Sequence, residues 1–148
     1  MNINKFVDKK YEKMSLKQLA ASPVDALQGL SEKDAKVLKE AFKVKTVSDL
    51  AKLKYIKWAQ AICLLAEGEE NKFGLGRYMN INNFVDKEYE KMTFEQLKSA
   101  PFEALQGISN NDSILIKKAF RKKQLSKFAN IAQAIVTLAE AEVSAAST

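Results

Sequence analysis

Apolar residues recur every three or four positions through most of the chain, and no stretch alternates between apolar and polar residues for long enough to suggest a strand. Two stripes illustrate the spacing: Ala35, Leu38, Ala41 and Phe42, and further on Ile56, Ala59, Ile62, Cys63 and Ala66. This spacing is typical of amphipathic helices that turn one side toward a core. The pattern therefore predicts an all-α fold made of short helices.

Polar residues mark where these helices begin. Two pairs have the spacing of capping boxes, in which a hydroxyl and an amide satisfy the free N–H groups at a helix start: Ser15 with Gln18 and Thr93 with Gln96. Thr46 with Asp49 predicts another helix start. Pro23 and Pro101 are expected at the first position of a helix, where proline is favoured.

Most of the chain is duplicated. The phrase NINKFVDKKYEKM at 2–14 returns as NINNFVDKEYEKM at 80–92, an offset of 78 residues. Farther along, WAQAI at 58–62 corresponds to IAQAI at 131–135, an offset of 73, so the second copy is five residues shorter. A repeat of this length indicates one structural unit used twice.

These boundaries divide the chain into four parts. We expect a helical repeat at 1–67, a linker at 68–78, a second helical repeat at 79–143 and a disordered tail at 144–148. The linker contains three of the five glycines, and its GLG is interpreted as a hinge because no strand precedes it, as a phosphate-binding fingerprint requires.

Composition narrows the class of protein. The chain has 148 residues, of which 47% are hydrophobic and 28% charged, as in soluble globular proteins. It contains no apolar run of membrane-spanning length, and its first ten residues lack the apolar core of a signal peptide, so we expect a cytoplasmic protein without a membrane partner. Cys63 is the single cysteine, which excludes an internal disulfide.

The residues needed for common catalytic chemistry are missing. Histidine is absent, which removes the commonest general base, and one cysteine without histidine excludes ordinary zinc sites. We therefore expect no enzymatic activity, no metal and no cofactor. Cys63 is interpreted as a small buried hydrophobe rather than a reactive thiol, and Trp58 as a core residue rather than a platform for base stacking.

Each copy contains a glycine turn between two helical stretches. The first is built from Leu27, Gly29, Leu30, Ala35 and Leu38, and the second from Leu105, Gly107, Ile108 and Ser113. This arrangement resembles the helix-hairpin-helix motif, although Ser31 and Ser109 stand where that family has a second glycine. The phrases FVDKxYEKM and AQAI resemble those of a family of small helical bacterial proteins to which we attach no activity.

The resemblance implies binding to the phosphate backbone of DNA without reading of its sequence, because backbone N–H groups at a helix start attract phosphate oxygens. The residues expected at such contacts are Gly29, Ser31, Lys33, Gly107 and Ser109. A structural interpretation fits the same residues: the glycines close a tight turn, and each serine is a helix N-cap rather than a catalytic nucleophile.

Charge distinguishes the second copy. The chain has a net charge of +6, and residues 117–127 contain six cations and no acid: Lys117, Lys118, Arg121, Lys122, Lys123 and Lys127. The aligned residues 39–49 hold three lysines against two acids, a net charge of +1. A helix that begins at Ser109 would place Lys117 and Arg121 in one row and Lys118 and Lys122 in the next, with Leu115, Ile116, Ala119 and Phe120 facing inward.

Two functions of different class remain. The first is binding to a nucleic-acid backbone without sequence specificity, in which the basic run meets phosphates. The alternative is a protein-interaction or scaffold module, in which the tandem helical units present a groove to a partner or to each other. Without any ligand, the dipole at a helix C-terminus would account for one or two of the lysines.

Overall fold

The computed structural model describes residues 2–68 and 85–142, and over these residues the prediction of an all-α fold is confirmed. The α-helices are α1 (Leu16–Ala20), α2 (Glu32–Phe42), α3 (Val47–Ala51), α4 (Lys54–Glu67), α5 (Phe94–Lys98), α6 (Asn110–Ala119) and α7 (Lys122–Ala139). Single 3₁₀ turns accompany them: η1 (Lys9–Tyr11), η2 (Val24–Ala26), η3 (Lys87–Tyr89) and η4 (Phe102–Ala104). Within the described ranges, β pairing is limited to isolated bridges such as Val7 with Leu27 and Val85 with Leu105.

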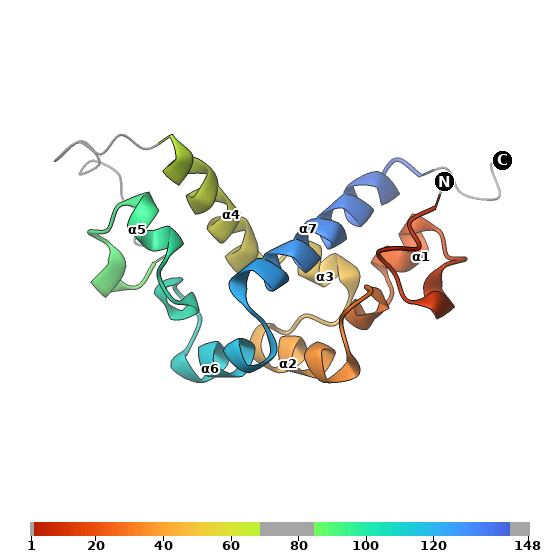
Figure 1. Ribbon diagram of the computed structural model, residues 1–148, viewed down its shortest axis with the longest axis horizontal. Helices are drawn as coiled ribbons and strands as arrows, with labels where there is room; N and C mark the ends of the chain where they lie inside the picture. Colours follow the sequence, from red (N-terminus) through yellow and green to blue (C-terminus); the bar gives the residue numbers. More distant parts are fainter. Residues whose placement is uncertain (1, 69–84, 143–148) are drawn as a thin grey trace. The chain divides into compact units, whose positions relative to one another are not determined.

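The helices assemble into two compact units that do not coincide with the sequence repeats (Figure 1). The described residues of 1–53 and 115–148 form one unit, which we call the terminal unit, and those of 54–114 form the central unit. Helix α4, from the first sequence copy, therefore belongs with α5, whereas α7, from the second copy, belongs with α1 and α3. The predicted linker lies outside the described residues except for Gly68, and the predicted tail lies entirely outside them.

In the terminal unit, α7 packs against both α1 and α3 (Figure 1). Leu19 of α1, Leu50 of α3 and Leu125 of α7 are buried in this core. Ala129 and Ala132 are fully buried on the same face of α7. Small side chains at these positions let the helix backbones approach closely, while each buried leucine contributes roughly 1.5–3 kcal/mol of transfer free energy.

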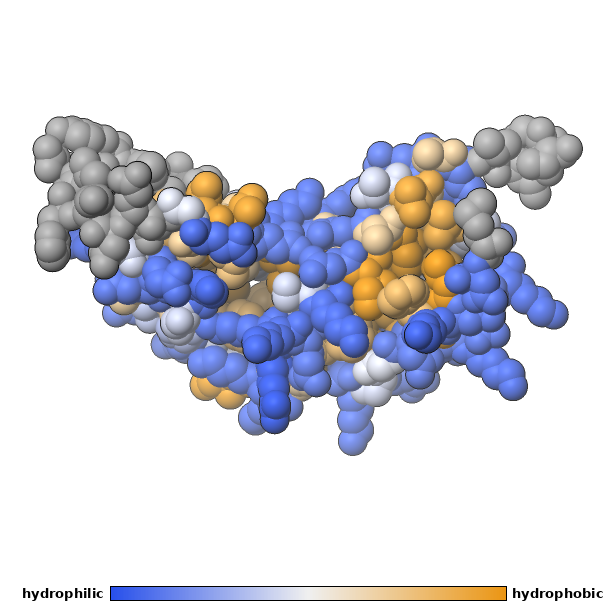
Figure 2. Space-filling view, turned by 45° about the horizontal axis from the view of Figure 1, so that its top comes forward, coloured by the Kyte–Doolittle hydropathy of each residue, from blue (hydrophilic) through white to orange (hydrophobic). Residues whose placement is uncertain are grey.

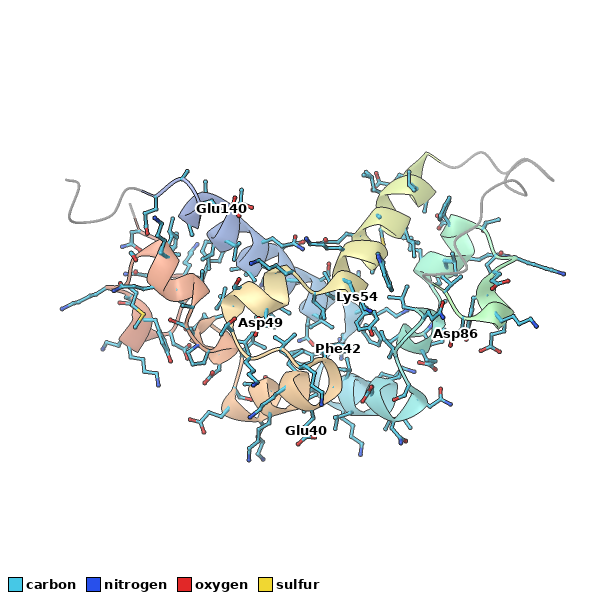
Figure 3. The ribbon with its side chains drawn as sticks, turned by 180° about the vertical axis from the view of Figure 1, so that it is seen from behind. Glu40, Phe42, Asp49, Lys54, Asp86 and Glu140 are labelled. Carbon is cyan, nitrogen blue, oxygen red and sulfur yellow. The ribbon has the colours of Figure 1, made fainter. Side chains whose placement is uncertain are left out.

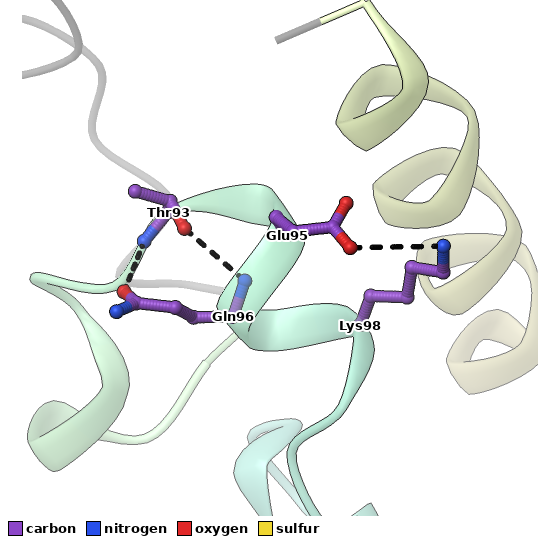
Figure 4. A network of polar contacts seen from close by, with 4 residues as sticks. All are labelled: Thr93, Glu95, Gln96 and Lys98. Atoms are coloured by element: carbon purple, nitrogen blue, oxygen red, sulfur yellow. Dashed lines mark hydrogen bonds and ion pairs between the residues drawn. The ribbon is translucent and has the colours of Figure 1, made fainter. Parts of the chain in front are cut away.

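In the central unit, α4 packs against α5. Its core contains Ile62, Val85 and Leu97, with three partly buried residues packed around them: Tyr89, Phe94 and Leu105. Helix α5 begins with the predicted capping box, in which Thr93 Oγ1 accepts the Gln96 N–H and Gln96 Oε1 accepts the Thr93 N–H, at 3.1 and 3.0 Å (Figure 4). Lys98 Nζ lies 3.9 Å from Glu95 Oε1, one turn apart on the same helix.

The other predicted helix starts are also present, with one correction. Ser15 and Thr46 cap α1 and α3 in reciprocal boxes with Gln18 and Asp49. Pro23 and Pro101, however, precede η2 and η4 as N-caps instead of occupying their first positions, so the expectation for the prolines was wrong. Before the first of these turns, the Ser22 hydroxyl donates to Gln18 O at 2.7 Å.

The five-residue difference between the copies explains why α7 is one long helix. When the N-caps Thr46 and Arg121 are aligned, the second copy lacks the three residues at 43–45 before the cap. It also lacks the two residues Lys52 and Leu53, which separate α3 from α4. Without that break, the counterparts of α3 and α4 run on as a single helix.

Candidate nucleic-acid interface

The glycine turns that resemble the hairpin motif adopt a backbone conformation that requires glycine. Gly29 has φ of 98° and Gly107 has φ of 103°, in the left-handed half of conformational space where a Cβ atom is strained. Leu30 and Ile108 follow them as buried residues, and their N–H groups donate to Leu27 O and Leu105 O. The turns are thus fixed by the backbone and by core packing.

An aromatic ring covers each turn from the side where a Cβ would project. At Gly29, a Cβ would lie 3.3 Å from Phe128 Cζ of α7, within the terminal unit. At Gly107, it would lie 2.6 Å from Tyr55 Oη of α4, within the central unit. Close contact with a ring accounts for glycine at both positions and favours the structural interpretation of these residues.

The serine after the first turn is engaged in capping α2. Ser31 Oγ accepts the Asp34 N–H, and the Ser31 N–H donates to the Asp34 carboxylate, both at 3.1 Å. Glu32 adds a second carboxylate to the same first turn, and Lys33 lies exposed between the two acids. A phosphate arriving here would meet two negative charges, and the Ser31 N–H already has a partner.

The second turn contains fewer acids than the first, and its serine also caps the helix that follows. Ser109 Oγ accepts the Asp112 N–H at 3.1 Å, as expected of an N-cap. Asn110 and Asn111 stand where the first copy has Glu32 and Lys33, which leaves Asp112 as the acid in this turn. Ser113, at the small position of the motif, is buried and donates its hydroxyl to the Glu103 carboxylate.

The basic run does not lie on one helix, so the prediction of two stacked rows was wrong. Helix α6 ends at Ala119 and α7 begins at Lys122. Between them, Phe120 is buried with its ring edge-on to Phe128, at a centroid distance of 6.4 Å. Arg121 is extended, with φ of −88° and ψ of 156°, and its N–H donates to Gln124 Oε1. Burial of Phe120 and capping at Arg121 break the helix.

The chain therefore turns between α6 and α7 with cations at the end of one helix and at the start of the other. We call this site the basic corner. Its six members are all exposed and all belong to the terminal unit: Lys117, Lys118, Arg121, Lys122, Lys123 and Lys127. Lys117 and Lys118 occupy the last turn of α6, where the helix dipole favours cations. Lys122 and Lys123 occupy the first turn of α7, where the dipole opposes them. Dipole stabilisation therefore explains only part of the cluster.

The corresponding corner of the first copy keeps its acids. The Asp49 carboxylate accepts the Lys45 and Thr46 N–H groups at 3.0 and 3.1 Å. Partial burial raises the pKa of Asp49, but these hydrogen bonds outweigh it and lower the pKa below its ordinary value, so the group is ionised at neutral pH. Glu40 points outward from α2 (Figure 3). In the second copy the neutral Gln124 takes the place of Asp49, and Lys118 that of Glu40.

Two residues interpreted as core lie nearer the surface. Cys63 is exposed, because the buried side of α4 runs through Ile62 and Ala66 and position 63 is turned away from it. Trp58 is half-buried, with its ring edge-on to Tyr55 at 5.7 Å and Lys54 Nζ 5.4 Å from its centroid. The four-residue spacing of Lys54 and Trp58 was the available signal for this cation–π contact.

No protein-family model matches the chain, and no curated protein or solved structure shows detectable similarity to it. In the described part of the chain, none of the helices has the length and apolar character to cross a membrane. The same residues contain no group of three or more acidic or cysteine side chains placed to hold a metal ion.

Proposed function

We propose that this chain is a non-enzymatic binding module of two tandem helix-hairpin-helix-like repeats. It binds the phosphate backbone of nucleic acid without sequence specificity, and the basic corner at the α6–α7 junction makes the main contacts.

The observation that carries this proposal is the concentration of exposed cations at the corner. Six cations lie within eleven residues without an acid, and two of them sit against the helix dipole. Such a cluster carries self-repulsion that an anion relieves, and regularly spaced phosphates supply several anions at once. Contacts of this kind position a protein on nucleic acid but carry no sequence information.

The proposal assigns the glycine turns a supporting role. Gly29 and Gly107 are covered by aromatic rings, and Ser31 and Ser109 serve as N-caps, which leaves Lys33 as the exposed cation of the first turn. The two neighbouring acids, Glu32 and Asp34, would repel a phosphate bound beside Lys33. The turns therefore shape the units, and the basic corner provides the charge.

The test is a titration of fluorescently labelled duplex DNA at two salt concentrations. If all six cations neutralise a phosphate, the logarithm of the binding constant should fall with the logarithm of salt with a slope of about −5, from roughly −0.9 per contact. Scrambled duplexes of equal length should bind equally. Absence of binding at low salt, or binding that ignores salt, would reject the proposal.

The second candidate is a protein-interaction module, and exposed apolar residues favour it. Leu64 and Leu65 on α4 are 67% and 54% exposed, and Ile114 and Leu138 are also exposed. Figure 2 shows apolar areas on an otherwise largely hydrophilic face of the molecule. A protein partner at these residues would bind with little salt dependence, which separates this function from the first.

A further inference from the structure

The terminal unit is built from the two ends of the chain. Its parts, residues 2–53 and 115–142 of the described chain, are linked covalently through the central unit. Between them, Glu142 Oε2 accepts the Leu16 N–H at 2.8 Å and Glu142 Oε1 accepts the Lys17 N–H at 3.1 Å. Gln133 Nε2 also donates to Ala51 O at 3.4 Å.

Each end contributes buried apolar residues to the shared core of the terminal unit. Leu50 on the N-terminal side and Leu125 and Ala132 on the C-terminal side are at most 1% exposed in the assembled unit. Phe128 from the C-terminal side also closes the turn at Gly29. Because a helix in a protein gains most of its stability from packing of its apolar face, each end is stabilised by its complement.

The two sequence copies already exchange their last helices within one chain. Helix α4 docks in the central unit and α7 in the terminal unit, each away from the first helices of its own copy. The two helices bury matching positions at the offset of 73 residues: Ile56 and Ala129, Ile62 and Ile135, Ala66 and Ala139. Of the two, α7 docks on helices that are far from it in sequence, since α1 and α3 belong to the first 51 residues.

We propose that a second copy of this chain is a binding partner through the same surface. In the resulting dimer, the C-terminal segment of each molecule packs on the N-terminal segment of the other. Every contact within the terminal unit is retained in this arrangement, so the balance between monomer and dimer depends on chain entropy and concentration.

The concentration range follows from tethering. The two segments are joined through the central unit, residues 54–114, and not by a short flexible linker. Their effective concentration is therefore at most the roughly millimolar value that a short flexible linker provides. We therefore expect monomers at micromolar concentration and exchanged dimers after refolding near the millimolar range. Conversion should be slow, because the terminal unit must open before it re-forms between two chains.

The first experiment is complementation between two damaged chains. Leu50→Glu damages the N-terminal segment and Ala132→Glu damages the C-terminal segment, since each places a charge at a fully buried position. When the two variants are unfolded together and refolded, an exchanged heterodimer contains one undamaged terminal unit. Native mass spectrometry should detect this heterodimer, and its helical signal should exceed the mean of the two variants refolded alone.

The matched control mixes Leu50→Glu with Leu19→Glu, because both changes lie in the N-terminal segment and no exchange restores an undamaged unit. Recovery in the first mixture and not in the control supports the exchange. Equal recovery in both mixtures would overturn it.

The second experiment uses the wild-type chain and decides the question if the variants do not fold. Unlabelled and isotope-labelled chains are refolded together at about 10 µM and at about 1 mM, on either side of the expected range. Mixed dimers that form at the higher concentration and persist for hours after dilution support the proposal. Monomers at both concentrations, or dimers that dissociate at once on dilution, would overturn it.

Discussion

Replacement of Gly107 by alanine should destabilise the central unit more than the equivalent change at Gly29 destabilises the terminal unit. Both substitutions force a Cβ onto a residue with φ near 100°, which costs about 1–3 kcal/mol. At Gly107 the new Cβ would additionally lie 2.6 Å from Tyr55 Oη, whereas at Gly29 it would lie 3.3 Å from Phe128 Cζ. The hydroxyl clash should disappear in a Tyr55→Phe background, giving a coupling of about 0.5–3 kcal/mol between the two changes.

The chain offers a local probe for this cycle. Trp58 is the only tryptophan and belongs to the central unit, so its fluorescence during urea unfolding reports on the unit that contains Gly107. Far-ultraviolet circular dichroism, recorded in parallel, reports on the helices of both units. Gly107→Ala should shift the fluorescence transition to lower urea, and Tyr55→Phe should reverse part of that shift.

Two outcomes would refute the packing of these turns. The first is a Gly107→Ala variant as stable as wild type, since neither the positive φ nor the ring contact would then hold. The second is a loss of unfolding free energy on Gly107→Ala that is the same with Tyr and with Phe at position 55. That result would mean that the Tyr55 hydroxyl does not lie against the turn.

Three further predictions concern single side chains. Ser31→Ala and Ser109→Ala should each cost about 0.5–2 kcal/mol in urea unfolding, and unchanged stability would remove their role as caps. Hydrogen bonds from the Leu16 and Lys17 N–H groups lower the pKa of Glu142 below its ordinary value of 4.5, so its stabilising effect should be complete above that pH and disappear as the pH falls through the lowered pKa. A Glu142→Gln variant should lose this part of the pH dependence, and an unaltered acid unfolding curve would contradict the contact. Cys63 should react with a thiol reagent in the folded protein about as fast as in urea, and strong protection would contradict its exposure.

Helix starts were predictable because their signals are local. The boxes at Ser15, Thr46 and Thr93 depend on residues three apart, which lie close together whatever the rest of the chain does. The glycines at the turns were recognisable for a similar reason, because positive φ is a property of one residue. The break between α6 and α7 was not predictable in this way, because it depends on burial of Phe120 against Phe128.

The exchange of helices was hidden by the repeat itself. Because α4 and α7 carry matching apolar positions, the pattern does not distinguish docking on one body from docking on the other. The exposure of Cys63 shows a related limit, since its neighbours Ile62 and Ala66 are buried and only the docked geometry of α4 decides which edge of the stripe faces solvent. Periodicity predicts that a helix has an apolar face, but the width of the buried part depends on its partner.

The basic corner itself was visible in the sequence as a run of cations, but its placement on two helices was not. A continuous helix would have carried the cations toward one C-terminus, where the dipole stabilises only those in the last turn. The observed break puts Lys122 and Lys123 at a helix start, where the dipole opposes them. The structure thereby adds a physical reason to expect an anion at this corner.

The most direct test compares two pairs of neutralised lysines in the duplex titration. One variant combines Lys118→Gln with Lys123→Gln in the basic corner, and its control combines Lys36→Gln with Lys39→Gln on α2. All four lysines are exposed and both variants lose the same net charge, so a general electrostatic effect is equal in the two. If the basic corner holds the phosphates, the first variant should lose about 2 from the magnitude of the salt slope and bind every duplex more weakly, while the control keeps the wild-type slope. An equal decrease of the salt slope in both variants, or no decrease in either, would contradict the assignment of the phosphate contacts to the basic corner.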